Sequence, residues 1–266
     1  MKIKTLKLKA KEKLKENKKM LYKTAGLYLL FYVIVLALSA WINVYSEDLA
    51  DLFHSVGLFF IFPILFANIA IIVSSEKKSN EKITGFHFYK NNRLVKTLLT
   101  RFIPSFFVFL WILPVCFLLG IGIAVFYEAK TTIFAAVVVL LVLALLVISI
   151  YKSLQYSLTS YIVAENTIIS PYDALKESKK LTKGNIRKLF LLNLSFIGWV
   201  ILIPFSLTLV CIYLIPYYNA SIFEFYTSLK AKDDLSDVSI ETLSKDILKE
   251  EEVRKINNEE KPDNEA

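Results

Sequence analysis

Residues 189–229 read LFLLNLSFIGWVILIPFSLTLVCIYLIPYYNASIFEFYTSL, about 40 residues that contain no Lys, Arg or Asp and a single Glu. A helix needs about 20 apolar residues to cross the roughly 30 Å hydrocarbon core of a bilayer. The run is therefore too long for one membrane helix and long enough for two. It predicts that the chain is a polytopic membrane protein.

Further apolar runs precede this stretch, and they cover residues 24–44, 52–74, 102–127 and 132–151. Pro204 divides the last run, because proline removes a helical hydrogen-bond donor and disfavours a continuous helix. The division gives two more segments, near 187–204 and 207–229. We therefore expect an all-α, polytopic membrane helix bundle with about six transmembrane helices. A five-helix arrangement, in which the last run is re-entrant, is the alternative.

The composition agrees with a membrane protein, since 55% of the residues are hydrophobic and the mean hydropathy is +0.51. Soluble domains are typically about 45–50% apolar. The net charge of +8 is unevenly distributed: residues 230–266 hold 12 acidic and 7 basic residues, a net −5, so the remainder carries +13. Its basic residues lie between the apolar runs, a pattern typical of membrane orientation and not of nucleic-acid binding.

The distribution of basic residues predicts the topology. Residues 2–19 hold nine Lys, and the loops 75–101 and 152–188 hold seven basic residues each, whereas residues 45–51 hold three acidic residues and no basic one. Basic loops stay on the cytoplasmic side of a membrane. We therefore expect both termini to be cytoplasmic, with an even number of crossings.

The ends of the chain differ in character from the transmembrane domain, residues 24–229. Residues 1–23 form a basic segment in which Ile3, Leu6, Ala10 and Leu14 recur on one helical face. This pattern predicts an interfacial amphipathic helix with its lysines near anionic lipid headgroups; a solvated stub that only sets orientation is the alternative. Residues 230–266 are acidic and poor in aromatic residues, which predicts a mostly disordered cytoplasmic tail.

A cytoplasmic helix is expected near residues 170–184. Ser170, Pro171 and Asp173 have the spacing of an N-cap, a proline in the first turn and an acidic residue near the helix start. Gly184 followed by Asn185 is typical of a helix end. This helix leads directly into the fifth expected span.

Three motifs carry a resemblance to a known family. Residues 178–199 read SKKLTKGNIRKLFLLNLSFIGW, residues 216–229 read PYYNASIFEFYTSL, and residues 13–17 read KLKEN. Over about residues 1–229 the chain resembles the bacterial family of integral membrane proteins catalogued as domain of unknown function 975. The resemblance implies a multi-pass protein of the bacterial cytoplasmic (inner) membrane and implies no activity. The motif residues are Gly184, Asn185, Gly198, Trp199, Pro216, Tyr217, Phe225 and Tyr226.

A candidate polar cluster lies within the expected spans. Its members are Asn68, Asn193, Asn219 and Glu224, and the first, second and fourth fall at similar depth near the cytoplasmic ends of their spans. Ionisable groups in hydrocarbon are costly and are functional candidates by default. Interhelical hydrogen bonding, a substrate or proton path, and a snorkelling Glu224 are the three interpretations of this cluster.

No enzyme motif is present: the chain contains no HExxH, Walker A, GxSxG or Gly-rich dinucleotide turn. His54 and His87 fall on opposite sides of the membrane in this topology, and Cys116 and Cys211 are typical packing residues. We therefore expect no catalytic residue, no metal, no cofactor and no nucleic-acid partner.

The sequence thus favours a non-catalytic membrane protein that acts through helix contacts. It would be a helper, assembly or protective (immunity) partner of an envelope or transport system, bound to a membrane protein or to copies of itself. A small-solute transporter or channel that uses the polar cluster is the alternative.

Overall fold

The computed structural model of the chain describes residues 3–76, 83–89, 93–129, 132–204, 206 and 209–259. Within these residues the protein is all helical and contains no strand, which confirms the all-α prediction. The elements are α1 (Ile3–Glu16), α2 (Lys18–Asn43), α3 (Glu47–Glu76), η1 (His87–Tyr89), α4 (Arg93–Ala129), α5 (Thr132–Tyr156), α6 (Thr159–Glu165), α7 (Pro171–Thr182), α8 (Ile186–Leu194), α9 (Ile197–Ile201) and α10 (Val210–Glu259).

The chain divides into two compact units, Met1–Tyr226 and Thr227–Ala266. Several expected features fall in part outside the described residues. They are the bases Lys77, Lys78, Lys82 and Lys90, the turn between the third and fourth spans, the turn near Pro204 and the last residues of the acidic tail.

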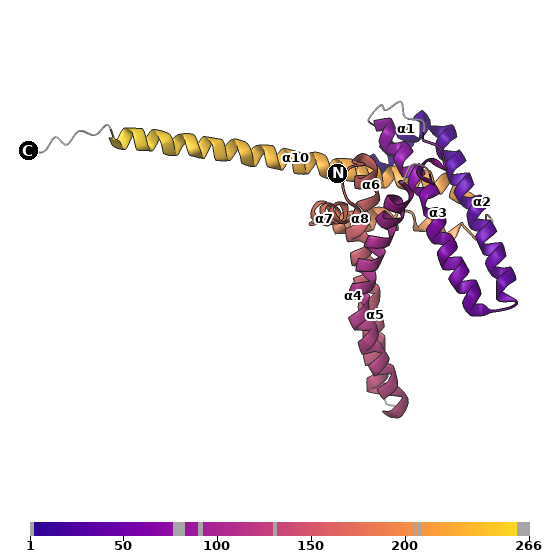
Figure 1. Ribbon diagram of the computed structural model, residues 1–266. Coiled ribbons are helices and arrows are strands. Elements are labelled where there is room, and N and C mark those ends of the chain that lie inside the picture. The colour runs from indigo at the N-terminus through magenta and orange to yellow at the C-terminus, as the bar shows by residue number, and fades with distance from the viewer. Residues whose placement is uncertain are drawn as a thin grey trace, which may run out of the picture. The chain divides into compact units, whose positions relative to one another are not determined.

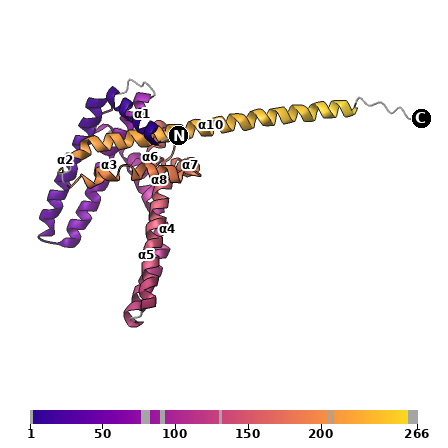
Figure 2. The ribbon, with the colours of Figure 1, turned by 180° about the vertical axis from the view of Figure 1, so that it is seen from behind.

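Two long antiparallel hairpins, α2–α3 and α4–α5, dominate the first unit. Figures 1 and 2 both show them pointing to the same side and standing apart from each other toward their tips. Gly57 brings α3 close to α2, because a Cβ built at this position would lie 2.8 Å from Val35 Cγ1. Val35, Ile61 and Ile64 form the core between these two helices.

Four helical segments are long and apolar enough to cross a membrane: Lys18–Asn43, Glu47–Glu76, Arg93–Val125 and Ala136–Glu165. Each overlaps most of one of the first four expected spans. In the α3 segment most of the apolar window is buried inside the protein, whereas in the α4 and α5 segments none of it is. Apolar surface of this extent needs an apolar surrounding, so the chain is a membrane protein.

The remaining helices of the first unit gather where α2 begins and α3 ends (Figure 1), and we call this region the base. The base comprises α1, η1, α6, α7, α8, α9 and residues 210–226 of α10. It holds most of the buried polar side chains discussed below.

The fifth expected span, 187–204, is not one continuous helix in the structure. The structure divides it into α8 and α9, of nine and five residues. Nine residues extend about 14 Å, half the thickness of the hydrocarbon core. The break follows from the polar residues in the run, because the Ser195 hydroxyl donates to the Leu192 carbonyl and competes with the helical pattern.

The sixth expected span, 207–229, is not among the helical segments that qualify as membrane spans in the described part of the chain. Tyr213 stacks on Tyr22 near the start of α2, with ring centroids 6.3 Å apart. Tyr226 donates a hydrogen bond to Glu165 at the end of α6. Tyr213 and Tyr226 are 13 positions apart, which is about 20 Å along a helix, yet both contacts lie at the base. This part of α10 therefore runs along the base, crosswise to α4 and α5 (Figures 1 and 2).

The N-terminal segment is helical as expected, but its apolar face does not point to lipid. Leu6, Ala10 and Leu14 of α1 are 2%, 0% and 5% exposed, and they are buried against the protein itself. The helix α1 packs against α2, α3 and α8, and its lysines also reach rings of α10. Lys7 and Lys11 lie over the rings of Phe196 and Tyr217.

The helix expected over 170–184 is α7. Ser170 is its N-cap, and its hydroxyl oxygen accepts a hydrogen bond from the Asp173 N–H at 3.1 Å. Gly184 follows the helix with φ +78°, a left-handed conformation that favours glycine.

The second unit contains the C-terminal part of α10, which is helical through Glu259. The sequence predicts a mostly disordered tail, because residues 230–266 are acidic and poor in aromatic residues. The tail is also rich in Lys, Glu, Leu and Ile, and the straight-chain residues among these have high intrinsic helix propensity.

Candidate functional site

Asn68 lies on α3 eight residues before the end of that helix, and it is 1% exposed. Its Nδ2 donates to the Leu21 carbonyl at 3.0 Å and to Thr24 Oγ1 at 3.1 Å, both on α2. The Thr24 hydroxyl donates in turn to the Leu21 carbonyl at 3.0 Å. Asn68 therefore ties the start of α2 to the end of α3 in the base.

Asn219 of α10 joins this group, because its Nδ2 donates to Asn68 Oδ1 at 3.1 Å. On the other side, the buried Tyr161 of α6 donates its hydroxyl to Asn219 Oδ1 at 3.3 Å. Two of the predicted cluster residues are thus in direct contact, and they connect α2, α3, α6 and α10. We call Thr24, Asn68, Tyr161 and Asn219 the asparagine network.

Asn193 of α8 contacts α10 at the residue before Asn219. Its Oδ1 accepts from the Tyr218 hydroxyl at 2.6 Å, and its Nδ2 donates to the Leu189 carbonyl at 2.8 Å. Burial raises the pKa of the Tyr218 hydroxyl, which stays neutral and donating at physiological pH. Asn193 therefore attaches α8 to α10, next in sequence to Asn219.

Glu224 does not face lipid, because it pairs with a lysine from α1. Lys13 Nζ lies 2.9 Å from Glu224 Oε1 and 2.5 Å from Glu76 Oε2, and it stands 4.4 Å from the centroid of the Phe223 ring. The Lys13 and Glu224 side chains are only 10% and 11% exposed. The pair fastens α1 to α10, and the snorkelling interpretation of Glu224 does not fit this geometry.

A neighbouring lysine on α1 also contacts the base. Lys7 Nζ donates to the Ser195 carbonyl at 3.0 Å, at the break between α8 and α9. Partial burial lowers the pKa of Lys7, and the nearby charge of Lys11 lowers it further. This bond satisfies a carbonyl at the end of α8, where the helix leaves it without an intrahelical partner.

The motif residues divide between turns and the contacts of α10. Gly184 and Asn185 separate α7 from α8, and Gly198 lies on α9 with open space around its missing Cβ. Trp199 lies 5.8 Å from the ring of Tyr213. Buried side chains of α10 supply the rest of the motif: Tyr217, Phe225 and Tyr226, which follow Pro216. The motif thus builds the base.

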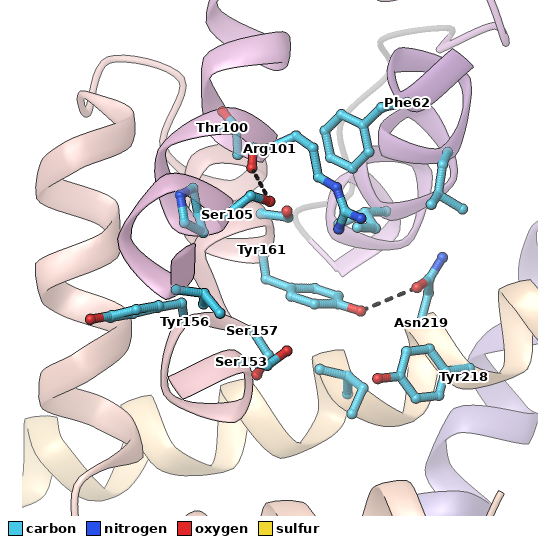
Figure 3. A pocket seen from close by; sticks show the side chains of 16 residues that line it. Phe62, Thr100, Arg101, Ser105, Ser153, Tyr156, Ser157, Tyr161, Tyr218 and Asn219 are labelled. Atoms are coloured by element: carbon cyan, nitrogen blue, oxygen red, sulfur yellow. Dashed lines mark hydrogen bonds between the residues drawn. The ribbon is translucent and has the colours of Figure 1, made fainter. Parts of the chain in front are cut away.

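A cavity of about 430 Å³ adjoins the asparagine network between α3, α4, the α5–α6 segment and α10 (Figure 3). Its polar lining consists of Arg101 and several hydroxyl and amide side chains: Thr100, Ser105, Ser153, Tyr156, Ser157, Ser160, Tyr161, Tyr218 and Asn219. Its apolar lining consists of Phe62, Leu65, Ile69, Pro104, Val108 and Ile222.

Arg101 is the charged residue of this lining. Figure 3 shows its side chain leaving α4 toward Phe62, and the guanidinium lies 5.7 Å from the centroid of the Phe62 ring. No carboxylate pairs with it among the residues that the structure describes.

Sequence reasoning missed Lys13, Tyr161 and Arg101. Lys13 resembled the other lysines of a basic segment, and only the packing of α1 on α10 sets it apart. A usable signal existed for the cavity, since Ser153, Ser157 and Ser160 recur at helical spacing just beyond an apolar run. His54 and His87 lie toward opposite ends of the α2–α3 hairpin, and the described residues contain no group of three metal-ligating side chains.

Comparisons with known proteins give one match. No curated protein and no solved structure matches the chain. A family model described as "Protein of unknown function (DUF975)" matches residues 1–233.

Proposed function

The chain belongs to the DUF975 family, and from this premise we propose that it is a non-catalytic multi-pass membrane protein that acts through helix contacts. Its role would be that of a helper, assembly or immunity partner of an envelope or transport system. The observation that carries the proposal is the α4–α5 hairpin, whose apolar surface is left uncovered by the rest of the protein.

Large apolar side chains are exposed along both helices of this hairpin. Phe109, Trp111 and Phe117 of α4 and Leu140 and Val147 of α5 are each at least half exposed. In the α2–α3 hairpin, by contrast, most of the apolar window of α3 is buried. The α4–α5 hairpin is therefore the part of the protein best able to receive the helices of a partner or of a second copy.

Gly120 adds to this argument because it gives α4 a position of close approach. Nothing lies within 4 Å of a Cβ built there, whereas Gly122 faces Leu141 and Val138 of α5 at 3.5 and 3.6 Å. Small residues on an outward face allow another transmembrane helix to pack closely.

The polar cluster supports a structural role more than a transport path. Asn68, Asn193 and Asn219 are each hydrogen-bonded within the base, and Glu224 pairs with Lys13. In the described part of the chain, Ser39 Oγ is the one buried side-chain polar atom without a partner. A cluster satisfied in this way holds helices together and offers few groups to a passing solute.

We place the protein in the bacterial cytoplasmic (inner) membrane with the base and both termini in the cytoplasm. The exposed lysines of α1, among them Lys4, Lys9 and Lys15, lie at the base, and basic segments favour the cytoplasmic side. There they would contact anionic headgroups of the bilayer. No nucleic-acid partner is part of the proposal.

A second candidate function is that of a small-solute transporter or channel. The cavity of about 430 Å³ beside Asn219 favours it, because the cavity combines a cation with several hydroxyl groups. Ligand pockets commonly have volumes of about 300–1,000 Å³.

Native purification in nanodiscs followed by crosslinking mass spectrometry tests the first proposal. We expect a partner at near-fixed stoichiometry, or a second copy, crosslinked through α4–α5 or docked at α7 or the tail. Gly120→Phe should reduce this association without lowering the melting temperature. Leu52→Phe, at an exposed site of α3 in the other hairpin, is the control and should leave the association unchanged.

A monomer without crosslinked protein would contradict the proposal. If that monomer instead gains thermal stability from a particular small solute, the transporter candidate replaces it.

A further inference from the structure

The cavity beside the asparagine network has the chemistry of an anion site. Arg101 supplies a guanidinium with five N–H donors in a planar fork, a geometry that matches phosphate oxygens. Ser153 and Ser160 line the same cavity and make no hydrogen bond to the described protein. Their hydroxyls are therefore available to a ligand, as is the guanidinium, which faces the ring of Phe62 and no carboxylate.

The depth of the cavity matches the headgroup layer of a membrane. Arg101 lies about 12 Å along α4 from its start, and the residues beyond it extend about 42 Å, more than the roughly 30 Å core requires. Ser153 lies about 32 Å along α5 from Thr132. When the tips of the hairpin lie at the far boundary of the hydrocarbon core, both residues therefore reach the headgroup layer at the base.

Aromatic side chains continue from the cavity toward the tips of the hairpins. Phe59 of α3 contacts Phe102 of α4 with ring centroids 6.4 Å apart, and Phe102 stacks on Phe106 at 5.9 Å. Phe102 and Phe106 are both about half exposed. Since the two hairpins diverge in this direction (Figures 1 and 2), acyl chains that lie here have an aromatic wall to pack against.

We propose that this cavity binds the phosphate group of an anionic phospholipid, with Arg101 as the cation, Ser153 and Ser160 as hydroxyl donors, and the acyl chains along Phe102 and Phe106. The site goes beyond the helper role, because it uses the inner side of α4 and does not depend on the outward face at Gly120. The two proposals can fail independently.

Native mass spectrometry of the full chain tests this site. The protein is exchanged from nanodiscs of phosphatidylglycerol or of phosphatidylcholine, and the lipid retained per protein is counted. We expect retention of phosphatidylglycerol over phosphatidylcholine, and a loss of about tenfold in Arg101→Gln, because the charge-assisted hydrogen bonds disappear. Lys188→Gln makes the same change of charge at an exposed site of α8 and should retain the lipid.

A second variant tests the same site without changing the charge of the protein. Ser160→Leu removes a free hydroxyl and reduces the space for the phosphate group while Arg101 stays in place, so it should also lower retention. Both variants are compared with the native chain by melting temperature. Equal retention in the native chain and in correctly folded Arg101→Gln overturns the proposal, as does equal retention of phosphatidylcholine.

Soluble ligands separate a lipid site from a free-phosphate site. We expect inorganic phosphate and glycerol 3-phosphate to displace phosphatidylglycerol only in large excess, because they lack the acyl chains that contact Phe102 and Phe106. Displacement at concentrations equal to that of the lipid overturns the assignment to phospholipid.

Discussion

At the scale of single residues, Asn219 is the side chain on which the asparagine network depends. Its Nδ2 donates to Asn68 and its Oδ1 accepts from Tyr161, so Asn219→Ala leaves two buried polar groups without their partner. A buried group left unsatisfied costs about 1–3 kcal/mol. We expect Asn219→Ala to lower the free energy of unfolding by this amount, measured by denaturant titration of the purified protein in detergent.

The coupling of the two asparagines supplies the control for this prediction. Asn68→Ala should destabilise similarly, and the double variant should cost less than the sum, because the two side chains share a hydrogen bond. Asn43→Ala changes an exposed asparagine at the end of α2, outside the network, and should alter stability by less than about 0.5 kcal/mol. Additive losses would show that the network does not act as a unit.

The pairing of Lys13 with Glu224 gives a second prediction. Both side chains are nearly buried, and removal of one partner from a buried ion pair costs about 3–5 kcal/mol. We expect Lys13→Met to destabilise the protein by this amount in the same titration. Glu76 contributes less to this loss because its side chain is 54% exposed.

The double variant Lys13→Met with Glu224→Gln separates charge from packing. It should recover most of the lost stability, because no buried carboxylate then lacks its lysine. Lys9→Met removes an exposed lysine from the same helix and is the matched control. A loss as large in Lys9→Met as in Lys13→Met would contradict the pairing.

The residues of the asparagine network and of the Lys13–Glu224 pair differ in how far the sequence could predict them. Asn68 and Asn219 were found because a polar side chain in an apolar run is conspicuous. The partners of Asn193 and Glu224 could not be found, because they depend on where α1 and α8 pack on α10. Nothing in a row of similar lysines distinguishes Lys13 before that packing is known.

At the scale of the elements, the long hairpins were predictable and the base was not. The length of an apolar run determines whether a helix reaches across a membrane, so the spans in α2, α3, α4 and α5 could be located from composition. The run over 189–229 is also apolar, but its α10 part is largely buried against protein. Composition reports that a segment avoids water, and it does not distinguish lipid from a protein interior.

The α7 helix gives a prediction about its capping residue. The Ser170 hydroxyl accepts from the Asp173 N–H and donates to Asp173 Oδ2 at 2.7 Å. Replacement of a serine N-cap by alanine costs a helix about 1 kcal/mol. We therefore expect Ser170→Ala to speed hydrogen–deuterium exchange in the first turn of α7, with no change in α2 as the internal control.

The same contact makes the start of α7 sensitive to acid. The Ser170 hydroxyl, followed by the charge of Lys176, lowers the pKa of Asp173. A carboxyl with a lowered folded-state pKa stabilises the fold at neutral pH, and this contribution is lost as the pH falls through that pKa. Protection of the first turn of α7, corrected for the intrinsic exchange rate at each pH, should therefore fall below the ordinary Asp range, and less steeply in Ser170→Ala. Identical pH profiles would contradict the coupling.

At the scale of the whole chain, four spans and six spans place both termini on the same side, so the termini cannot separate the two topologies. The position of Ser206 distinguishes the two topologies. With six spans it would lie in an external turn between the last two crossings. With the base as the structure arranges it, Ser206 lies on the same side of the membrane as α7.

Cysteine labelling in sealed right-side-out vesicles tests this difference. In a chain whose Cys116 and Cys211 are replaced by serine, Ser206→Cys should resist a membrane-impermeant maleimide added from outside and react once the vesicles are opened. Ile168→Cys, 91% exposed in the base, should behave in the same way, and Val44→Cys, 79% exposed at a hairpin tip, should react without opening. If Ser206→Cys reacts as Val44→Cys does, residues 189–229 cross the membrane twice, and the contacts of α10 with Tyr22 and Glu165 do not form in the bilayer.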